Sequence, residues 1–202
     1  MNGIHAIVTF LENRESLRGI DPEFRELVKF FHRIPFCASF GVSCAGHFRE
    51  TNDTDDWNPD NFYPEPWGNL NIIVLPSIPH IQELLQILQK TISTSSDTSF
   101  KKIEHPFGPP ENSQLEIWEI RIGDNGCFGS LKEEYHGGYL PIKDNKIAYE
   151  ESKKRCREIR AFWKDLEREV ADFCQRHGFK RFGLKKRIKE IVTIWKMEIK
   201  NK

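Results

Sequence analysis

Short apolar segments of the chain predict β-strands. They lie at residues 4–10, 36–42, 70–75 and 115–122, and the last of them is followed by the turn signal GDNG. Apolar runs of four to eight residues that end at turn-forming sequence are typical of buried strands. We therefore expect a β-sheet whose strands are distributed over the first two thirds of the chain.

Apolar residues at helical spacing predict two helices in the same part of the chain. The first begins at Asp21 and Pro22, because aspartate caps free amides and proline suits the first helical position. It should end near Ile34, before Pro35. The second follows strand 70–75, and its apolar face consists of Ile81, Leu84, Leu85, Leu88 and Ile92. This alternation of strand and helix favours a sheet covered by helices.

A third and longer helix is predicted over residues 146–177. Its apolar stripe lies on a highly charged background and consists of Ile159, Phe162, Trp163, Leu166, Val170, Phe173 and Cys174. Gly178 is a natural helix stop. At a length of roughly 45 Å this helix would cross a small domain and bury one stripe against the sheet.

These elements predict one α+β domain with a mixed or antiparallel sheet. A chain of 202 residues is long enough for one sizeable core. We expect residues 1–145 to form the core, with the long charged helix and a basic C-terminal segment, residues 146–202, packed on it. Serine-rich residues 93–99 are expected to be a linker.

Charge is balanced over the whole chain but not at its C-terminal end. The protein has 30 basic and 30 acidic residues, so no global field draws it to nucleic acid or a membrane. Residues 176–202, however, carry ten lysines and arginines against two glutamates. Such a segment is either a solvated helix face or a phosphate-binding surface, and RNA is then the leading partner. The candidate contacts are Lys180, Arg181, Lys185, Lys186 and Arg187.

The five cysteines form an odd set without regular spacing. The sequence MNGIHAIVTF lacks the features of a signal peptide, and no apolar run approaches membrane-spanning length. We therefore expect reduced thiols, a cytoplasmic location and no membrane partner.

The most reactive-looking segment is SCAGH, residues 43–47. Cys44 could be a nucleophile activated by His47, or Ser43 and Gly46 could line a ligand site where the turn brings backbone amides close. Alternatively, Cys44 is an inert buried thiol. Cys37, Cys44 and His47 with His32 or His5 fit a zinc site poorly, because only one tight ligand pair is present, and no metal is expected.

Two polar stretches could complete such a site. Residues 49–68 are rich in aspartate, asparagine and proline, and their aromatics, including Trp57 and Trp67, must tuck into the domain or bind a flat ligand. This stretch could be a lid near Cys44, a cation site or a solvated loop. Glycine-rich residues 123–139 could add a second wall, with Gly126 and His136, or simply form turns.

The order of these features resembles the wybutosine-synthesis tRNA methyltransferases. Members of that family have an N-terminal helix, a proline, a strand leading into a Ser-Cys-Ser-Gly-Arg stretch, and a long charged C-terminal helix. Pro35, Ser43, Cys44 and Gly46 take the matching places, whereas Ala45 and His47 depart from the pattern.

The resemblance covers most of the chain and implies methyl transfer from S-adenosylmethionine to a modified guanosine of tRNA. It also implies that residues 43–46 line the site. The alternatives are a non-catalytic RNA- or protein-binding module and a cysteine-dependent hydrolase using Cys44 and His47, which differ from methyl transfer in needing no S-adenosylmethionine.

Overall fold

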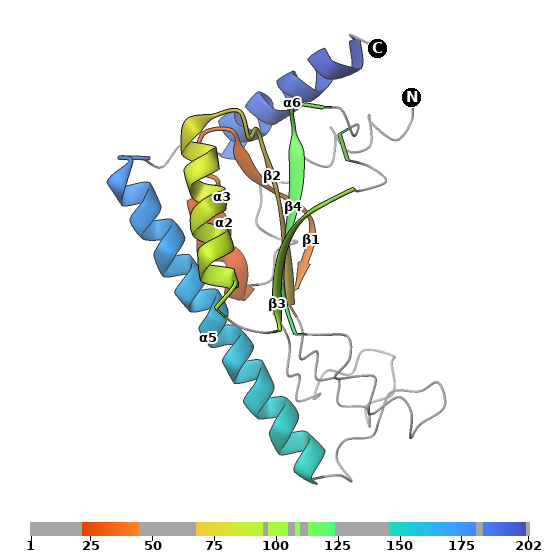
Figure 1. The fold of residues 1–202 in the computed structure, drawn as a ribbon, viewed down its shortest axis with the longest axis vertical. Coiled ribbons are helices and arrows are strands. Elements are labelled where there is room, and N and C mark those ends of the chain that lie inside the picture. The colour runs from red at the N-terminus through yellow and green to blue at the C-terminus, as the bar shows by residue number, and fades with distance from the viewer. Residues whose placement is uncertain are drawn as a thin grey trace.

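The computed structural model describes residues 22–44, 68–94, 97–104, 108–109, 113–123, 146–180 and 184–200. Residues 22, 41–44, 146–153, 184–185 and 198–199 are described by their backbone alone. The elements in chain order are η2 (Pro22–Phe24), α2 (Arg25–Phe31), β1 (Cys37–Cys44), β2 (Gly68–Val74), α3 (Pro79–Ile92), β3 (Thr98–Ile103), β4 (Glu116–Ile122), α5 (Lys146–Arg176) and α6 (Leu184–Lys200) (Figure 1).

The described strands form one antiparallel sheet with the order β1-β2-β4-β3. The predicted α+β class is confirmed, and the sheet is antiparallel rather than mixed. Strands predicted at 36–42, 70–75 and 115–122 correspond to β1, β2 and β4. The strand predicted at residues 4–10 lies outside the described residues.

Strand β3 is a correction to the sequence analysis. The expected linker 93–99 overlaps its first two residues, and the strand continues to Ile103. Its serine and threonine residues resemble a linker in the sequence, and the strand is stabilised by its pairing with β4. Phe100 lies opposite Ile120 in the register and is buried, whereas Lys101 and Lys102 are exposed.

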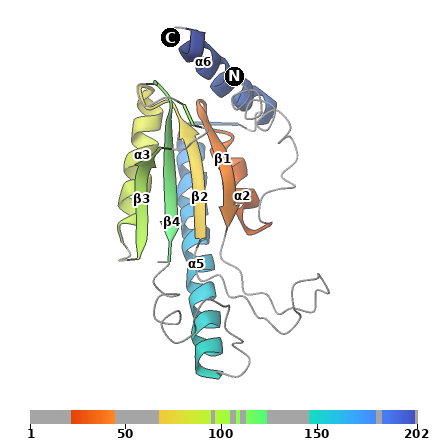
Figure 2. The ribbon, with the colours of Figure 1, turned by 90° about the vertical axis from the view of Figure 1, so that its right-hand side faces the viewer.

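Helices α2, α3 and α5 lie on one face of the sheet (Figures 1 and 2). Leu70, Ile72 and Val74 of β2 point into the core that these helices share with the sheet. The predicted helix at 146–177 is confirmed as α5, and its apolar stripe packs mainly against α2 and α3. At this contact the Phe24 and Trp163 rings meet edge to face, with centroids 4.6 Å apart.

Helix α6 covers part of the opposite face. Its buried side chains Ile188, Ile191, Val192 and Trp195 join a second apolar cluster with strand residues that include Phe40. The Phe40 and Trp195 ring centroids are 6.4 Å apart. The basic C-terminal segment therefore also has a structural role, because α6 covers part of the sheet.

The predicted stop of the long helix is confirmed. Gly178 has φ +64°, a conformation that glycine adopts without steric cost. Its amide donates to the Gln175 carbonyl at 3.0 Å, and the Phe179 amide donates to Cys174 at 2.9 Å. These bonds satisfy carbonyls at the helix end. Within the described part of the chain, no helix combines the length and apolarity needed to span a membrane.

Candidate nucleic-acid interface

Helix α6 has one buried face and one basic face. The buried face places Ile188, Ile191, Val192 and Trp195 against the sheet. The outward face carries Lys186, Lys189, Lys196 and Lys200, all exposed, with exposed Thr193 between them. With Thr193 included, the spacing of these positions alternates between three and four residues, so they lie along one side of the helix over about 21 Å. We call the four lysines the lysine stripe.

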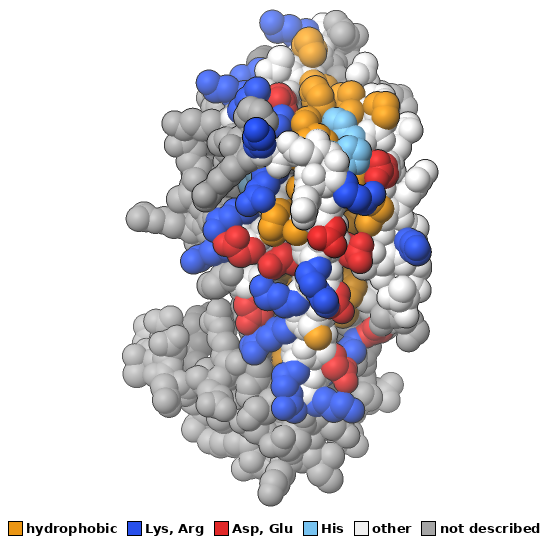
Figure 3. All heavy atoms as spheres, turned by 90° about the vertical axis from the view of Figure 1, so that its left-hand side faces the viewer, with side chains coloured by type: hydrophobic (Ala, Val, Ile, Leu, Met, Phe, Trp, Pro, Cys, Tyr) orange, Lys and Arg blue, Asp and Glu red, His pale blue; other side chains and the backbone are white. Residues whose placement is uncertain are grey.

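The lysine stripe differs from the charged surface of α5 in its ion pairing. On α5 most of the described basic side chains, although not Arg157, have acidic partners: Lys154 lies 3.9 Å from Glu158, and Lys164 lies 2.9 Å from Glu167. Figure 3 shows this face, where basic and acidic side chains are interspersed over the helix.

No such partners are seen along most of the stripe. Among the residues that the structure describes, Lys189, Lys196 and Lys200 make no ion pair. The acidic side chain described on α6, Glu190, is used by Arg187. The charges of these three lysines are therefore available to an external anion.

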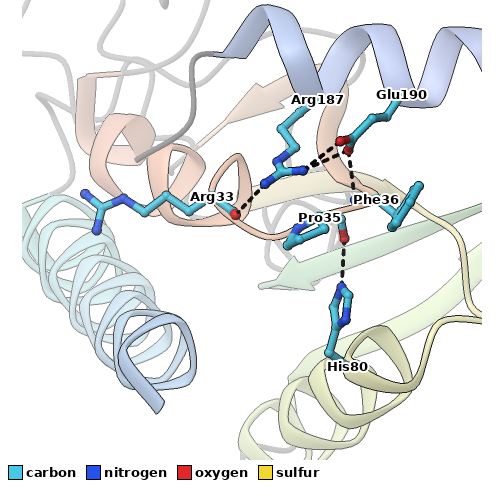
Figure 4. Close-up of polar contacts among 6 residues, drawn as sticks. All are labelled: Arg33, Pro35, Phe36, His80, Arg187 and Glu190. Atoms are coloured by element: carbon cyan, nitrogen blue, oxygen red, sulfur yellow. Dashed lines mark hydrogen bonds and ion pairs between the residues drawn. The ribbon is translucent and has the colours of Figure 1, made fainter. Parts of the chain in front are cut away.

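Arg187 is turned into the protein. Its side chain is 3% exposed, and Nη1 donates to both carboxylate oxygens of Glu190 at 2.9 Å. Nη2 donates to the Arg33 carbonyl at 3.3 Å (Figure 4). We therefore leave Arg187 out of the nucleic-acid-contacting set that the sequence suggested, because its guanidinium faces the core side of α6.

These contacts fasten α6 to the turn between α2 and β1. Glu190 accepts a hydrogen bond from the Phe36 amide at 3.4 Å, and Phe36 has φ +59°, an unusual conformation for a bulky residue. His80 of α3 donates to the Pro35 carbonyl at 3.1 Å from the other side (Figure 4). The lysine stripe is therefore held on an element with a fixed position relative to the sheet.

The other basic candidates are placed less completely. Lys180 is exposed just beyond the end of α5. Lys185 belongs to the first turn of α6, but its side chain is not described, and Arg181 lies outside the described residues. Lys180 can extend the basic surface, whereas Lys185 and Arg181 stay predictions.

The SCAGH segment begins where the sequence analysis placed it, at the end of a strand. Ser43 and Cys44 are the last residues of β1. Phe40 pairs with Asn71, and the next pair is Cys44 with Asn69, so β1 carries extra residues at this point. Such a bulge bends a strand and is common beside functional sites.

The chemistry expected of this segment rests on residues that the structure does not place. The Ser43 and Cys44 side chains are not described. Further candidates lie outside the described residues, namely Gly46, His47, Trp57, Trp67, Gly126 and His136. The nucleophile, the lid and the glycine-rich wall therefore stay predictions.

Two of the described thiols, Cys37 and Cys174, are unreactive in character. Cys37, Cys156 and Cys174 are buried, and none of these three forms a disulfide with another described cysteine. Burial raises the pKa of the Cys37 thiol far above its usual value, and the nearby Cys174 adds to this. Burial likewise raises the pKa of Cys174 to about 11, against the lowering effect of the Arg33 charge. Both thiols are protonated at neutral pH and are therefore weak nucleophiles and weak metal ligands.

His32, which the sequence analysis considered as a zinc ligand, has a hydrogen-bonding role in the core. Its Nε2 accepts the Ser39 amide at 3.2 Å and lies 3.0 Å from Ser39 Oγ. Within the described ranges no group of three or more histidine, cysteine or acidic side chains is arranged to hold a metal ion.

Sequence reasoning missed one group of polar residues. Asn69 and Asn71 of β2 and Glu119 and Arg121 of β4 lie on the same face of the sheet, beyond the part that α6 covers. The signal was present in the segments GNLNIIV and EIWEIRI, where polar and apolar residues alternate. Recognising the group required the strand register.

Comparisons with family models, curated proteins and solved structures find no match to this chain.

Proposed function

We propose that the protein binds RNA through the lysine stripe of α6. The observation that carries this proposal is the contrast in pairing: Lys189, Lys196 and Lys200 have no ion pair within the described structure, whereas most of the described basic residues of α5, although not Arg157, are paired. Unpaired lysines on a fixed helix attract phosphates without first losing an internal partner. The preference for RNA over another polyanion comes from the resemblance to a tRNA-modifying family.

Such binding would be sensitive to salt and tolerant of sequence. Lysine ammonium groups contact phosphates as point charges and carry no base information. If all four lysines of the stripe contact a single strand, the logarithm of the binding constant should fall with the logarithm of salt concentration with a slope of about −3. The zero net charge of the chain makes the local stripe the main source of this dependence.

The test compares two triple variants with equal loss of charge. One carries Lys189→Gln, Lys196→Gln and Lys200→Gln in the stripe, and the control carries Lys90→Gln, Lys154→Gln and Lys164→Gln on the exposed surfaces of α3 and α5. Fluorescence anisotropy measures affinity for labelled tRNA, single-stranded RNA and single-stranded DNA over a salt series. Circular dichroism checks that both variants are folded.

We expect the stripe variant to lose about tenfold or more in RNA affinity at about 100 mM salt, with a slope reduced by about 2. The control should lose no more than roughly twofold, because its lysines lie outside the proposed contact. Equal losses in the two variants would show that net charge alone attracts the RNA. If the wild-type protein bound single-stranded DNA as tightly as single-stranded RNA, the lysine stripe would be a general polyanion-binding site and not an RNA-specific one.

A methyl-transfer activity is a second proposal. It is supported by the resemblance and by the placement of Ser43 and Cys44 at the bulged end of β1. Isothermal titration calorimetry with S-adenosylmethionine tests it, and the absence of heat at high ligand concentration would contradict it. Iodoacetamide labelling across a pH series tests the hydrolase alternative: a Cys44 that labels with an ordinary thiol pKa, near about 8.5, would count against a nucleophile.

A further inference from the structure

The face of the sheet covered by α6 is apolar at one end and polar at the other. Near α6 the strands contribute Phe40, Ile73 and Ile117 to the apolar cluster. Further along the two central strands, the same face carries four polar residues. We call them the polar quartet: Asn69, Asn71, Glu119 and Arg121. The residues between them, such as Leu70 and Ile120, point to the other face and its core.

The register makes the polar quartet contiguous. Asn71 lies directly opposite Glu119, and Asn69 lies directly opposite Arg121. Opposite residues in an antiparallel pair have Cβ atoms about 5 Å apart, and alternate residues along a strand are about 7 Å apart. The four side chains therefore start from one small area at the centre of the sheet.

Asn71 is buried without a full set of hydrogen bonds. Its side chain is 7% exposed, and its Oδ1 atom is buried and has no hydrogen-bond partner within the described structure. Its register neighbours on the two sides are Phe40 and Glu119. A buried acceptor without a partner is unfavourable for folding alone, so its presence on a central strand calls for a ligand that donates a hydrogen bond.

The two charged members of the quartet add complementary features. The Glu119 side chain is 16% exposed, and Lys101 lies 3.6 Å from it at the exposed edge strand. Arg121 is half-buried and makes no ion pair within the described ranges. Together with Asn71 the site offers two hydrogen-bond acceptors beside one available guanidinium. This set fits a ligand that has both N–H donors and an anionic group.

We propose that the polar quartet holds a nucleotide of the bound RNA. In this arrangement Asn71 Oδ1 and the Glu119 carboxylate accept N–H groups from the edge of a base, and Arg121 binds a phosphate. Single-stranded RNA is recognised in this way, through exposed base edges and charged phosphates. The inference rests on the proposed function, because it takes the RNA held by the lysine stripe as the source of the nucleotide.

Three single variants test the site. Asn71→Leu replaces the amide whose Oδ1 is unpaired by an apolar side chain of similar size. Arg121→Gln removes the guanidinium, and Lys102→Gln is the control on the neighbouring strand, because Lys102 lies opposite Trp118 on the other face of the sheet. Calorimetry measures the binding of the four nucleoside 5′-monophosphates and inorganic phosphate to each variant. Anisotropy measures affinity for single-stranded RNA, and thermal unfolding measures stability.

The expected result separates binding from folding. Asn71→Leu should keep or raise the melting temperature, because a buried unpaired acceptor is removed, while mononucleotide affinity falls about fivefold or more. Arg121→Gln should weaken both mononucleotide and phosphate binding, and Lys102→Gln should leave both unchanged. The stripe variant, in which Lys189, Lys196 and Lys200 are replaced by glutamine, should lose RNA affinity but still bind mononucleotides.

Two outcomes would overturn the inference. One is the absence of mononucleotide binding to the wild-type protein at about 1 mM ligand, a weak but measurable affinity. The other is unchanged mononucleotide and RNA affinity in Asn71→Leu and Arg121→Gln. In both cases, if only the stripe variant lost RNA affinity, the lysine stripe would remain the proposed RNA-binding surface and the polar quartet would not be a nucleotide site.

Discussion

Arg187 Nη1 lies 2.9 Å from each carboxylate oxygen of Glu190, one helical turn further along α6. Glu190 also accepts the Phe36 amide, and Arg187 reaches the Arg33 carbonyl (Figure 4). The two members of this ion pair therefore connect α6, through these hydrogen bonds, to the turn that precedes β1. This connection directs Arg187 inward and leaves the neighbouring Lys186 and Lys189 on the outward face.

We predict that Glu190→Ala lowers the free energy of unfolding by about 2 to 4 kcal/mol. The substitution leaves the Arg187 charge buried without its carboxylate, which is costly, whereas Glu190 itself is partly exposed. Urea unfolding measures the change. The double variant Arg187→Met with Glu190→Met should recover much of the loss, since both charges are then removed, and Lys189→Ala should change stability little. A double variant no more stable than Glu190→Ala would contradict this account.

A truncation that removes residues 184–202 should destabilise the domain. It removes Ile188, Val192 and Trp195 from the second apolar cluster and exposes strand residues such as Phe40 and Ile73. We expect a lower melting temperature and increased binding of a hydrophobic dye, as for states with exposed apolar surface. A truncated protein with wild-type melting and dye binding would show that α6 is dispensable for the core. For this reason charge substitutions, rather than deletion, are the suitable test of RNA binding.

Gly178→Ala should lower the free energy of unfolding by about 1 kcal/mol. At φ +64° an added Cβ meets no atom within 4 Å, so the cost comes from the backbone conformation and not from a clash. Gly178→Asn should cost less, because asparagine tolerates this conformation better. Chemical denaturation of the two variants measures both effects. Equal losses for alanine and asparagine would argue against a conformational origin.

Cys174 should make stability depend on pH in the alkaline range. Burial raises the folded-state pKa of its thiol to about 11, above the ordinary value of 9.0. The folded state therefore holds this proton more tightly, and the associated stability is fully present below pH 9 and is lost as pH rises through 11. Denaturation of wild type and Cys174→Ala at several pH values should show a stability gap that narrows over this interval. A constant gap would contradict the raised pKa.

Local sequence was sufficient for several elements because their signals are local. The apolar periodicity of α3 and α5 and the glycine at position 178 predicted these helices and the end of α5. The apolar strand β2 was equally clear. The basic composition after Arg176 was also visible, although composition alone did not separate an outward lysine from an inward arginine.

The candidate sites depended on partners distant in the sequence. Strand β3 exists because Phe100 pairs with Ile120, and Arg187 is turned inward where the Arg33 carbonyl accepts its hydrogen bond. The polar quartet forms because register places Asn71 opposite Glu119.

The sequence by itself determined the α+β composition, the long helix and the basic C-terminal end, since periodicity and charge are properties of neighbouring residues. Only the tertiary structure decided which charges of α6 face outward and which polar residues of the sheet converge. Those outcomes follow from the burial of one face of each element against another, and a single segment does not contain that information.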